Sequence, residues 1–267
     1  MRYYLHLGVV YMSMQIRKFM TFKGSFIMQF FSQGLNYAVT FLLMWVMVNT
    51  FNNMNGWNAY EVMLLYAINL TAYGFAGMFF TFVRVFALRD ILNGAFDDVL
   101  VKPIRTLPYL IYNAITPSYV IHLTLSIIML ILCVSALGIP MGILHLLYLI
   151  EIIICGTFIF GAMFILITAP AFLVTSVNSL GSLLYFFRET SYYPLSIFPG
   201  FLQIIMTVIL PYGMINFFPV QPLLGKTDYL MFGPGIVWMM PLFTIIFYGI
   251  SVLVFSICLK RYKSSGS

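Results

Sequence analysis

The chain has 267 residues, of which 62% are hydrophobic and 7% are charged, and its mean hydropathy is +1.01. Ordinary globular domains carry about 25% charged residues, so this composition excludes a water-soluble globular protein and predicts a single membrane domain. The net charge of +6 does not indicate a nucleic-acid-binding protein, because the basic residues stand at the edges of apolar runs, as membrane topology signals do.

The first part of the chain predicts a surface helix followed by two spans. Residues 1–23 mix apolar side chains with four basic ones, so we expect an amphipathic elbow helix on the cytoplasmic face and no cleavable signal peptide. Residues 26–48 and 61–83 are each long and apolar enough to cross a hydrocarbon core of about 30 Å. The polar hairpin 49–58 joins them.

A charged segment at 84–106 separates the second span from the third. It contains seven of the twenty Lys, Arg, Asp and Glu residues of the chain, and long apolar runs lie on both sides of it. Such a segment has to lie in water. Its mixed signs and its Gly, Asp and Pro residues predict short helical pieces rather than a disordered loop.

The second half predicts four more spans and one broken segment. The expected spans are 107–137, 143–168, 172–187 and 237–259. Residues 192–226 are hydrophobic but contain five prolines, and the longest piece free of proline, Gly200–Leu210, has eleven residues, or about 16 Å of helix. We therefore expect a re-entrant helix pair on the outer side; the alternative is one kinked span.

Charge placement supports an all-α protein with six transmembrane helices in the cell membrane and both termini in the cytoplasm. In that topology eleven of the thirteen basic residues lie inside, and only Arg188 and Lys226 lie outside. The three cysteines, Cys133, Cys155 and Cys258, lie in apolar runs without CxxC spacing, so we expect core residues rather than disulfides or metal ligands.

Two sets of residues suggest a family. The segment GAFDDVLVKP at 94–103 is similar to the Gly-x-x-Asp-x-x-Leu-x-(Lys/Arg)-Pro loop of small ABC-2 type exporter permeases grouped with daunorubicin and viologen exporters. The second set is YPLSIFP at 193–199, Leu210-Pro211 and NFFP at 216–219. Together with the elbow, the charged loop and the broken segment, these residues make the chain resemble the ABC-2, or type V exporter, architecture over nearly its whole length.

The resemblance implies a non-catalytic permease subunit that acts as a dimer with a second permease, identical or related. Each permease would bind a separate ABC-type ATPase subunit, which holds the ATP and Mg²⁺. The loop after the second span would contain the coupling helix that fits a groove on the ATPase. The candidate residues of this interface are Arg89, Asp90, Asp97, Asp98, Lys102, Pro103 and Arg105. The alternative is that these charges only keep the loop solvated.

Other chemistry is sparse in the sequence. Gly225-Lys226-Thr227 resembles the end of a P-loop but lacks its first glycine and a preceding strand, and no HExxH or GxSxG motif or metal-spaced cluster occurs. His6, His122 and His145 are scattered and are expected to be structural. Glu151 is the acid that falls inside an expected span, where ionisable residues are costly and often functional. With Ser176, Asn178 and Ser179 it forms our candidate substrate path, although close helix packing explains those small residues equally well.

The leading hypothesis is the membrane subunit of an ATP-driven exporter for a hydrophobic or amphiphilic solute. A secondary transporter or channel that works without an ATPase is the first alternative. A membrane-embedded enzyme acting on lipid is disfavoured, because no pair of catalytic groups shares a membrane depth. The sequence does not identify the substrate.

Overall fold

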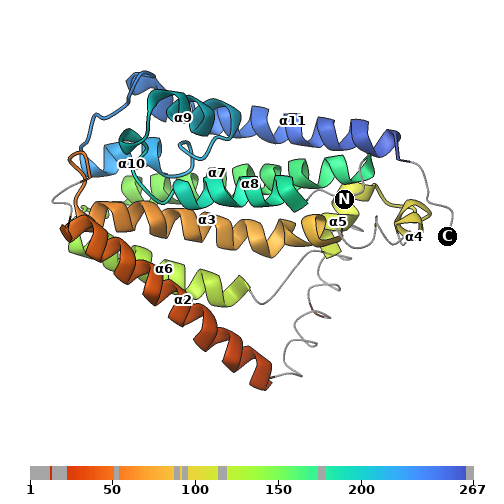
Figure 1. Ribbon diagram of the computed structural model, residues 1–267, viewed down its shortest axis with the longest axis horizontal. Coiled ribbons are helices and arrows are strands. Elements are labelled where there is room, and N and C mark those ends of the chain that lie inside the picture. Colours follow the sequence, from red (N-terminus) through yellow and green to blue (C-terminus); the bar gives the residue numbers. More distant parts are fainter. Residues whose placement is uncertain are drawn as a thin grey trace.

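The computed structural model describes residues 13, 23–50, 54–86, 91, 96–113, 119–173 and 178–262. Within these ranges the chain is helical, apart from connections and an isolated antiparallel bridge between Met54 and Trp57. The expected all-α class is thereby confirmed for the described residues. The long helices form an elongated bundle (Figure 1): α2 (Lys23–Thr50), α3 (Ala59–Phe86), α6 (Tyr119–Ala136), α7 (Ile143–Thr168), α8 (Asn178–Thr190) and α11 (Met240–Lys260).

In the described part of the chain, four helical stretches are long and apolar enough to cross a membrane by length and composition. They are Ala59–Thr81, Tyr119–Ala136, Ile143–Phe172 and Met240–Lys260. The chain is therefore a membrane-embedded helical protein, and the count of six spans stays a prediction. The elbow helix expected at 1–23 lies outside the described residues, except for positions 13 and 23.

The central element of the bundle is α3. Every residue from Glu61 to Ala72 is buried, because α6 packs against one side of α3 and α7 against another, while α11 packs against α7. Near the far end of α3, the Thr168 hydroxyl of α7 donates a hydrogen bond of 3.1 Å to the Val83 carbonyl. This core positions the two ends of the bundle, where the functional features lie.

Two glycines allow the helices around α3 to approach closely. A Cβ added at Gly77 would lie 2.0 Å from Cε1 of Tyr119 in α6, and one added at Gly161 of α7 would lie 2.8 Å from Cε2 of Phe80. Without the strong hydrophobic driving force that water provides, membrane helices associate through such close backbone packing.

One end of the bundle, here named the hairpin end, contains Met54–Asn58. Asn58 and Glu61 form a capping box at the start of α3: the Glu61 amide donates to Asn58 Oδ1 (3.0 Å), and the Asn58 amide donates to Glu61 Oε2 (2.7 Å). Glu61 Oε2 also lies 3.1 Å from Lys226 Nζ, which donates to the Gly56 carbonyl at 2.7 Å. Lys226 is therefore a structural cation and not part of a phosphate-binding loop.

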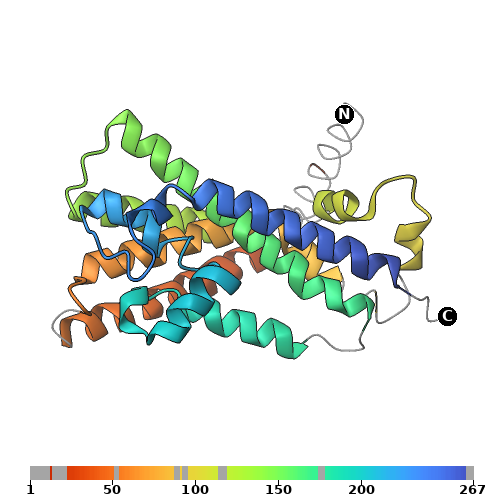
Figure 2. The same cartoon turned by 90° about the horizontal axis from the view of Figure 1, so that it is seen from above.

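The proline-rich segment consists of short helical pieces at the hairpin end (Figure 2): η3 (Leu195–Ile197), α9 (Gly200–Ile204), a π-helical turn (Ile205–Ile209), α10 (Phe217–Leu224) and η5 (Pro234–Val237). The piece from Gly200 to Ile209 has ten residues, or about 15 Å, and the chain then turns back instead of continuing through the bundle. Asn216 fixes the turn by donating to the carbonyls of Leu65 (3.2 Å) and Ser191 (2.7 Å).

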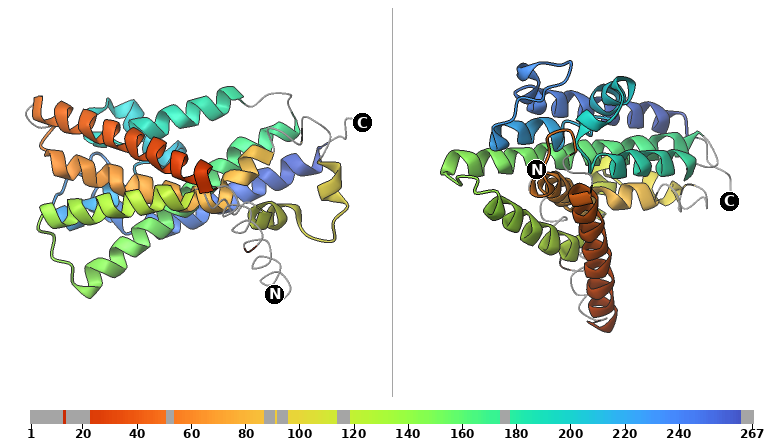
Figure 3. Two further views of the ribbon diagram at one scale, coloured as in Figure 1. Left: turned by 90° about the horizontal axis from the view of Figure 1, so that it is seen from below. Right: turned by 60° about the vertical axis from the view of Figure 1, so that its left-hand side comes forward.

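The helix α2 diverges from the bundle toward its N-terminal end, as Figure 1 and the right panel of Figure 3 show. It exposes apolar side chains along its length, including Met28, Phe31, Leu35 and Leu43, each at least 59% exposed. A surface of this kind suits lipid or another membrane helix rather than water.

Two helices differ from the expected spans. In place of one span at 107–137, the structure has α5 (Thr106–Asn113) and α6, which begins at Tyr119. In place of a span at 172–187, the 3₁₀ turn η2 (Ala169–Phe172) extends α7, and α8 begins at Asn178. With 13 residues, α8 is about 20 Å long and ends partway along the bundle.

Candidate functional site

The end of the bundle opposite the hairpin contains α4 (Asp97–Leu100), a single helical turn that projects beyond the long helices (Figures 1 and 2). One side of this segment is buried, because Phe96 and Val99 are 0% and 4% exposed. The other side is open: Asp98, Leu100 and Val101 are exposed, Val101 at 83%. The segment is therefore a protrusion with an anchored base and a free face.

Four aromatic rings anchor this protrusion, and we name them the anchor cluster: Phe96, Phe172, Phe255 and Tyr262. The Phe96 centroid lies 5.0 Å from that of Phe172 in η2 and 5.1 Å from that of Tyr262. Phe172 in turn lies 5.3 Å from Phe255 of α11. Aromatic pairs at these distances are worth about 0.5–1.5 kcal/mol each beyond their burial, so α4 is fixed to the ends of α7 and α11.

Two further contacts fix the protrusion. The Lys102 ammonium donates a hydrogen bond to the Tyr109 hydroxyl of α5 and lies 4.3 Å from the centre of that ring. Burial and the neighbouring Asp97 carboxylate raise the pKa of Tyr262, which keeps this phenol neutral beside the acid. The protrusion is thus joined to α5 and to the ends of α7 and α11.

A second polar cluster lies inside the bundle around Arg188 of α8. The guanidinium lies 3.7 Å from the ring centre of Tyr73, 5.0 Å from that of Tyr185 and 5.6 Å from that of Tyr192, and it donates a hydrogen bond to the Tyr192 hydroxyl. We name these three tyrosines the Arg188 cage. Arg188 is 9% exposed.

The depth of Arg188 follows from its contact with Tyr73. Tyr73 stands 14 residues after Ala59, the first residue of the 28-residue helix α3, which is about 21 Å along the axis. Arg188 therefore lies near the middle of a membrane span. Charge placement predicted Arg188 on the outer side, whereas α8 ends at Thr190, well short of the hairpin end.

The charge of Arg188 is only partly compensated by the protein. Burying an ion costs several kcal/mol of free energy. A contact with an aromatic ring face stabilises the ion by about 0.5–2 kcal/mol, and a hydrogen bond to a charged group contributes about 1.5–3 kcal/mol. Among the described residues no carboxylate forms an ion pair with Arg188, and its Nε–H has no acceptor. An intramembrane cation in this state indicates a functional site.

The comparison with protein families decides the identity of the chain. The model of a family described as ABC-2 family transporter protein matches residues 35–266, which is most of the sequence. The chain belongs to the ABC-2 transporter family. No curated protein and no solved structure matches it. The protein is therefore a membrane-embedded permease component of an ABC transporter, a class that associates with ABC ATPases.

The permease brings several of the predicted interface residues together at the protrusion. Asp97 and Asp98 are in α4, and Pro103 and Arg105 are exposed just after it, whereas Lys102 is turned back onto Tyr109. Arg89 and Asp90 lie outside the described residues. Whether these residues contact an ATPase stays a prediction.

Of the predicted substrate-path residues, Glu151 and Ser179 lie far apart in the structure. Glu151 is exposed on α7. It lies 17 residues, or about 25 Å along the helix axis, from Thr168 at the C-terminal end of α7, and α8 follows that end in the chain. Ser179 is exposed near the start of α8; Ser176 and the side chain of Asn178 lie outside the description. Within the described residues, Glu151 makes no ion pair with His122 or His145. The His122 ring instead forms a hydrogen bond with the Tyr37 hydroxyl and stacks on the Tyr119 ring.

Sequence reasoning missed the apolar tip of the protrusion and the Arg188 cage. It selected charged residues, although the centre of a protein interface is depleted in charge, and Leu100 and Val101 are the exposed apolar residues at the tip. A sequence signal for Arg188 existed in the segment LLYFFRET at 183–190, where an arginine directly follows an apolar run that contains one tyrosine. Among the described residues, no group of His, Cys, Asp or Glu could hold a metal ion.

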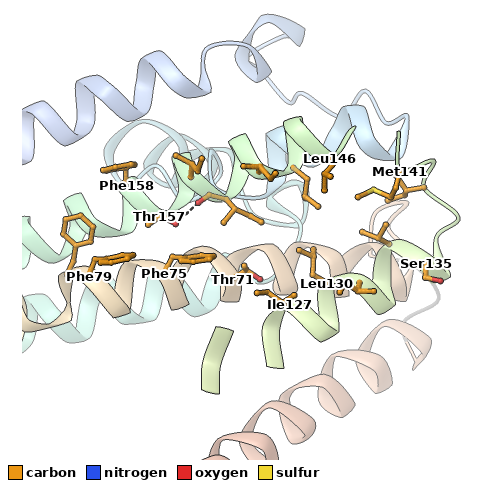
Figure 4. A pocket seen from close by; sticks show the side chains of 18 of the residues that line it. Thr71, Phe75, Phe79, Ile127, Leu130, Ser135, Met141, Leu146, Thr157 and Phe158 are labelled. Atoms are coloured by element: carbon orange, nitrogen blue, oxygen red, sulfur yellow. Dashed lines mark hydrogen bonds between the residues drawn. The ribbon is translucent and has the colours of Figure 1, made fainter. Parts of the chain in front are cut away.

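A large apolar cavity opens between α3, α6 and α7 of the permease (Figure 4). It has a volume of about 1100 Å³, and its lining includes Phe75, Phe79, Leu130 and Phe158. Thr157 lies in the wall, where its hydroxyl donates to the Ile153 carbonyl at 2.7 Å. A space of this size and character accommodates hydrocarbon chains rather than polar groups.

Proposed function

We propose that this permease is the transmembrane subunit of an ATP-driven exporter for a hydrophobic or amphiphilic solute. In this proposal α4 is the coupling helix, and its exposed face docks onto a separate ABC ATPase subunit that binds ATP and Mg²⁺. The observation that carries the proposal is the protrusion itself, which is free at Leu100 and Val101 and fixed at Phe96. A rigid projection can transmit closure of an ATPase to the spans, whereas a flexible loop cannot.

Three features support the export of an apolar solute by a dimer. The large cavity between α3, α6 and α7 is lined by apolar side chains. The diverging helix α2 offers an apolar surface to a second permease, identical or related, in the cell membrane. The residues at 94–103 and 193–199 resemble those of the daunorubicin and viologen exporter branch, and the placement of the basic residues favours cytoplasmic termini.

The docking face can be tested with Val101→Asp. The permease would be co-expressed with an ABC ATPase encoded beside its gene, purified through a tag on the permease, and assayed for bound ATPase. Val101 is 83% exposed, so the variant should fold, with a stability change within about 0.5 kcal/mol. We expect at least about a tenfold loss of ATPase binding, because a charge replaces an apolar contact at the interface centre.

Val101→Thr is the matched control and should bind the ATPase almost normally. Unchanged binding by Val101→Asp would refute docking through α4. Transport by the purified permease in liposomes without any ATPase would instead favour a secondary transporter or channel.

A further inference from the structure

The Arg188 cage is built like a binding site for an anion. A guanidinium has five N–H donors in a planar fork, and the cage satisfies it with one phenol hydroxyl and three ring faces. Aromatic faces attract a cation but cannot neutralise it. The buried Nε–H has no acceptor among the described protein groups, so the fork is left with hydrogen-bonding capacity that only another group can use.

Space for such a group exists beside the cage. A cavity of about 20 Å³ is lined by Arg188 together with Tyr73, Tyr185 and Tyr212. A volume of this size admits one atom-sized group, such as an oxygen of a carboxylate or a phosphate. The remainder of a bound molecule would therefore lie outside the cage.

The surface of α8 shows where the remainder would lie. Tyr185 forms one wall of the cage and is 48% exposed, and Leu183 and Phe186 on the same helix are 51% and 61% exposed. These apolar side chains stand at membrane depth, because α8 ends partway along the bundle. A hydrocarbon tail can lie against them while its polar end reaches Arg188 past Tyr185.

A neighbouring acid lies beside this approach. Glu189 stands one helical turn after Tyr185 on the same face of α8, and its carboxylate interacts with the Tyr185 hydroxyl. It also lines a cavity of about 360 Å³ together with Tyr192 and Phe198. An anion that reaches Arg188 past Tyr185 passes this carboxylate, so removal of the Glu189 charge should strengthen its binding.

We propose that Arg188 and its tyrosine cage bind the anionic group of an amphiphile, a phosphate or a carboxylate on a hydrocarbon chain. The source is either the transported solute or a membrane lipid headgroup. If the ligand is the transported solute, the inference rests on the proposed function. Binding of the anion itself concerns the permease alone and is tested without an ATPase.

The experiment uses the full-length permease in phosphatidylcholine nanodiscs and measures its melting temperature. Hexadecyl phosphate is the anionic probe, hexadecyltrimethylammonium is the cationic control with the same chain, and a third sample contains phosphatidylglycerol and no probe. We expect hexadecyl phosphate at about ten times its Kd to raise the melting temperature by about 3–6 °C, and the cation to have no such effect. An equal rise with both probes overturns the proposal without any variant.

Variants then assign the effect to the cage. Arg188→Gln should abolish the shift, and Arg188→Lys should retain part of it, because the charge stays but the fork is lost. Glu189→Gln is the matched control and should keep the full shift or increase it. A full shift in Arg188→Gln overturns the proposal, as does its loss in Glu189→Gln.

The sample that contains phosphatidylglycerol distinguishes between the two possible sources of the anion. A rise with hexadecyl phosphate but not with phosphatidylglycerol identifies the ligand as a solute. An equal rise with phosphatidylglycerol that depends on Arg188 identifies a lipid headgroup. If ATPase docking fails while these shifts are observed, the proposed function is wrong and the anion site stands.

Discussion

The rings of Phe96 and Phe172 lie 5.0 Å apart and join the base of the protrusion to the end of α7. The two residues are 76 positions apart in the chain: Phe96 directly precedes α4, and Phe172 ends the 3₁₀ turn that extends α7. Phe172 also contacts Phe255 of α11, so a movement of α4 acts on two long helices through one ring.

Phe96→Ala should uncouple ATP hydrolysis from transport. Phe96 is fully buried, and truncating a buried Phe typically costs about 3–5 kcal/mol, here mainly in the anchoring of α4. We expect ATP-driven transport to fall at least about tenfold while ATPase binding through the exposed face is retained in part. Transport and hydrolysis would be measured together in proteoliposomes. Phe201→Ala, at a position 64% exposed, is the control; normal coupling in Phe96→Ala would contradict the role of the anchor cluster.

Gly77→Ala should destabilise the permease through overpacking. The added Cβ would meet Cε1 of Tyr119 at 2.0 Å, and this ring is held by a hydrogen bond of 3.0 Å from Thr81 and by stacking on His122. We expect a loss of about 1–3 kcal/mol, seen as a lower melting temperature in detergent micelles. Gly249→Ala in α11 has open space around the new Cβ and should be neutral or stabilising. Equal changes in melting temperature at both sites would show that helix propensity, and not close packing, determines the loss of stability.

Glu61 has two functions that substitutions can separate. Glu61→Gln keeps an acceptor for the Asn58 amide but removes the charge 3.1 Å from Lys226, and should cost about 0.5–1 kcal/mol because the pair is partly solvated. Glu61→Ala loses the cap as well and should cost about 1–3 kcal/mol in total. Melting temperatures at low and high salt provide the measurement, and the Gln effect should shrink with salt. Identical losses in both variants would mean that the cap contributes nothing.

Asn216→Ala should loosen the proline-rich segment. The amide donates to the carbonyls of Leu65 and Ser191 and its oxygen accepts from the Phe217 amide, so the truncation leaves three buried groups without this partner. A cost of about 1–3 kcal/mol for an unsatisfied buried group predicts faster hydrogen exchange of residues 210–217. Asn36→Ala, at an exposed position of α2, should leave this exchange unchanged. Unaltered exchange in Asn216→Ala would show that packing alone holds the turn.

The class of the protein and the order of its helices along the chain could be predicted from the residues alone. The composition requires a lipid environment, and apolar runs of suitable length predict helices. Prolines between 194 and 222 interrupt the segment before α11. The motif at 94–103 indicates the ABC-2 family, which the comparison confirmed. These features are local: each depends on neighbouring residues and on the solvent they require.

The residues that share a site were revealed by the packing of the helices. The Arg188 cage draws on α3, α8 and the turn after α8, and the depth of Arg188 depends on where α8 stops. The helix α4 is too short for any periodicity, so nothing in its sequence shows that Phe96 faces inward and Val101 outward. Partners separated by tens of residues are chosen by packing, which no local pattern encodes.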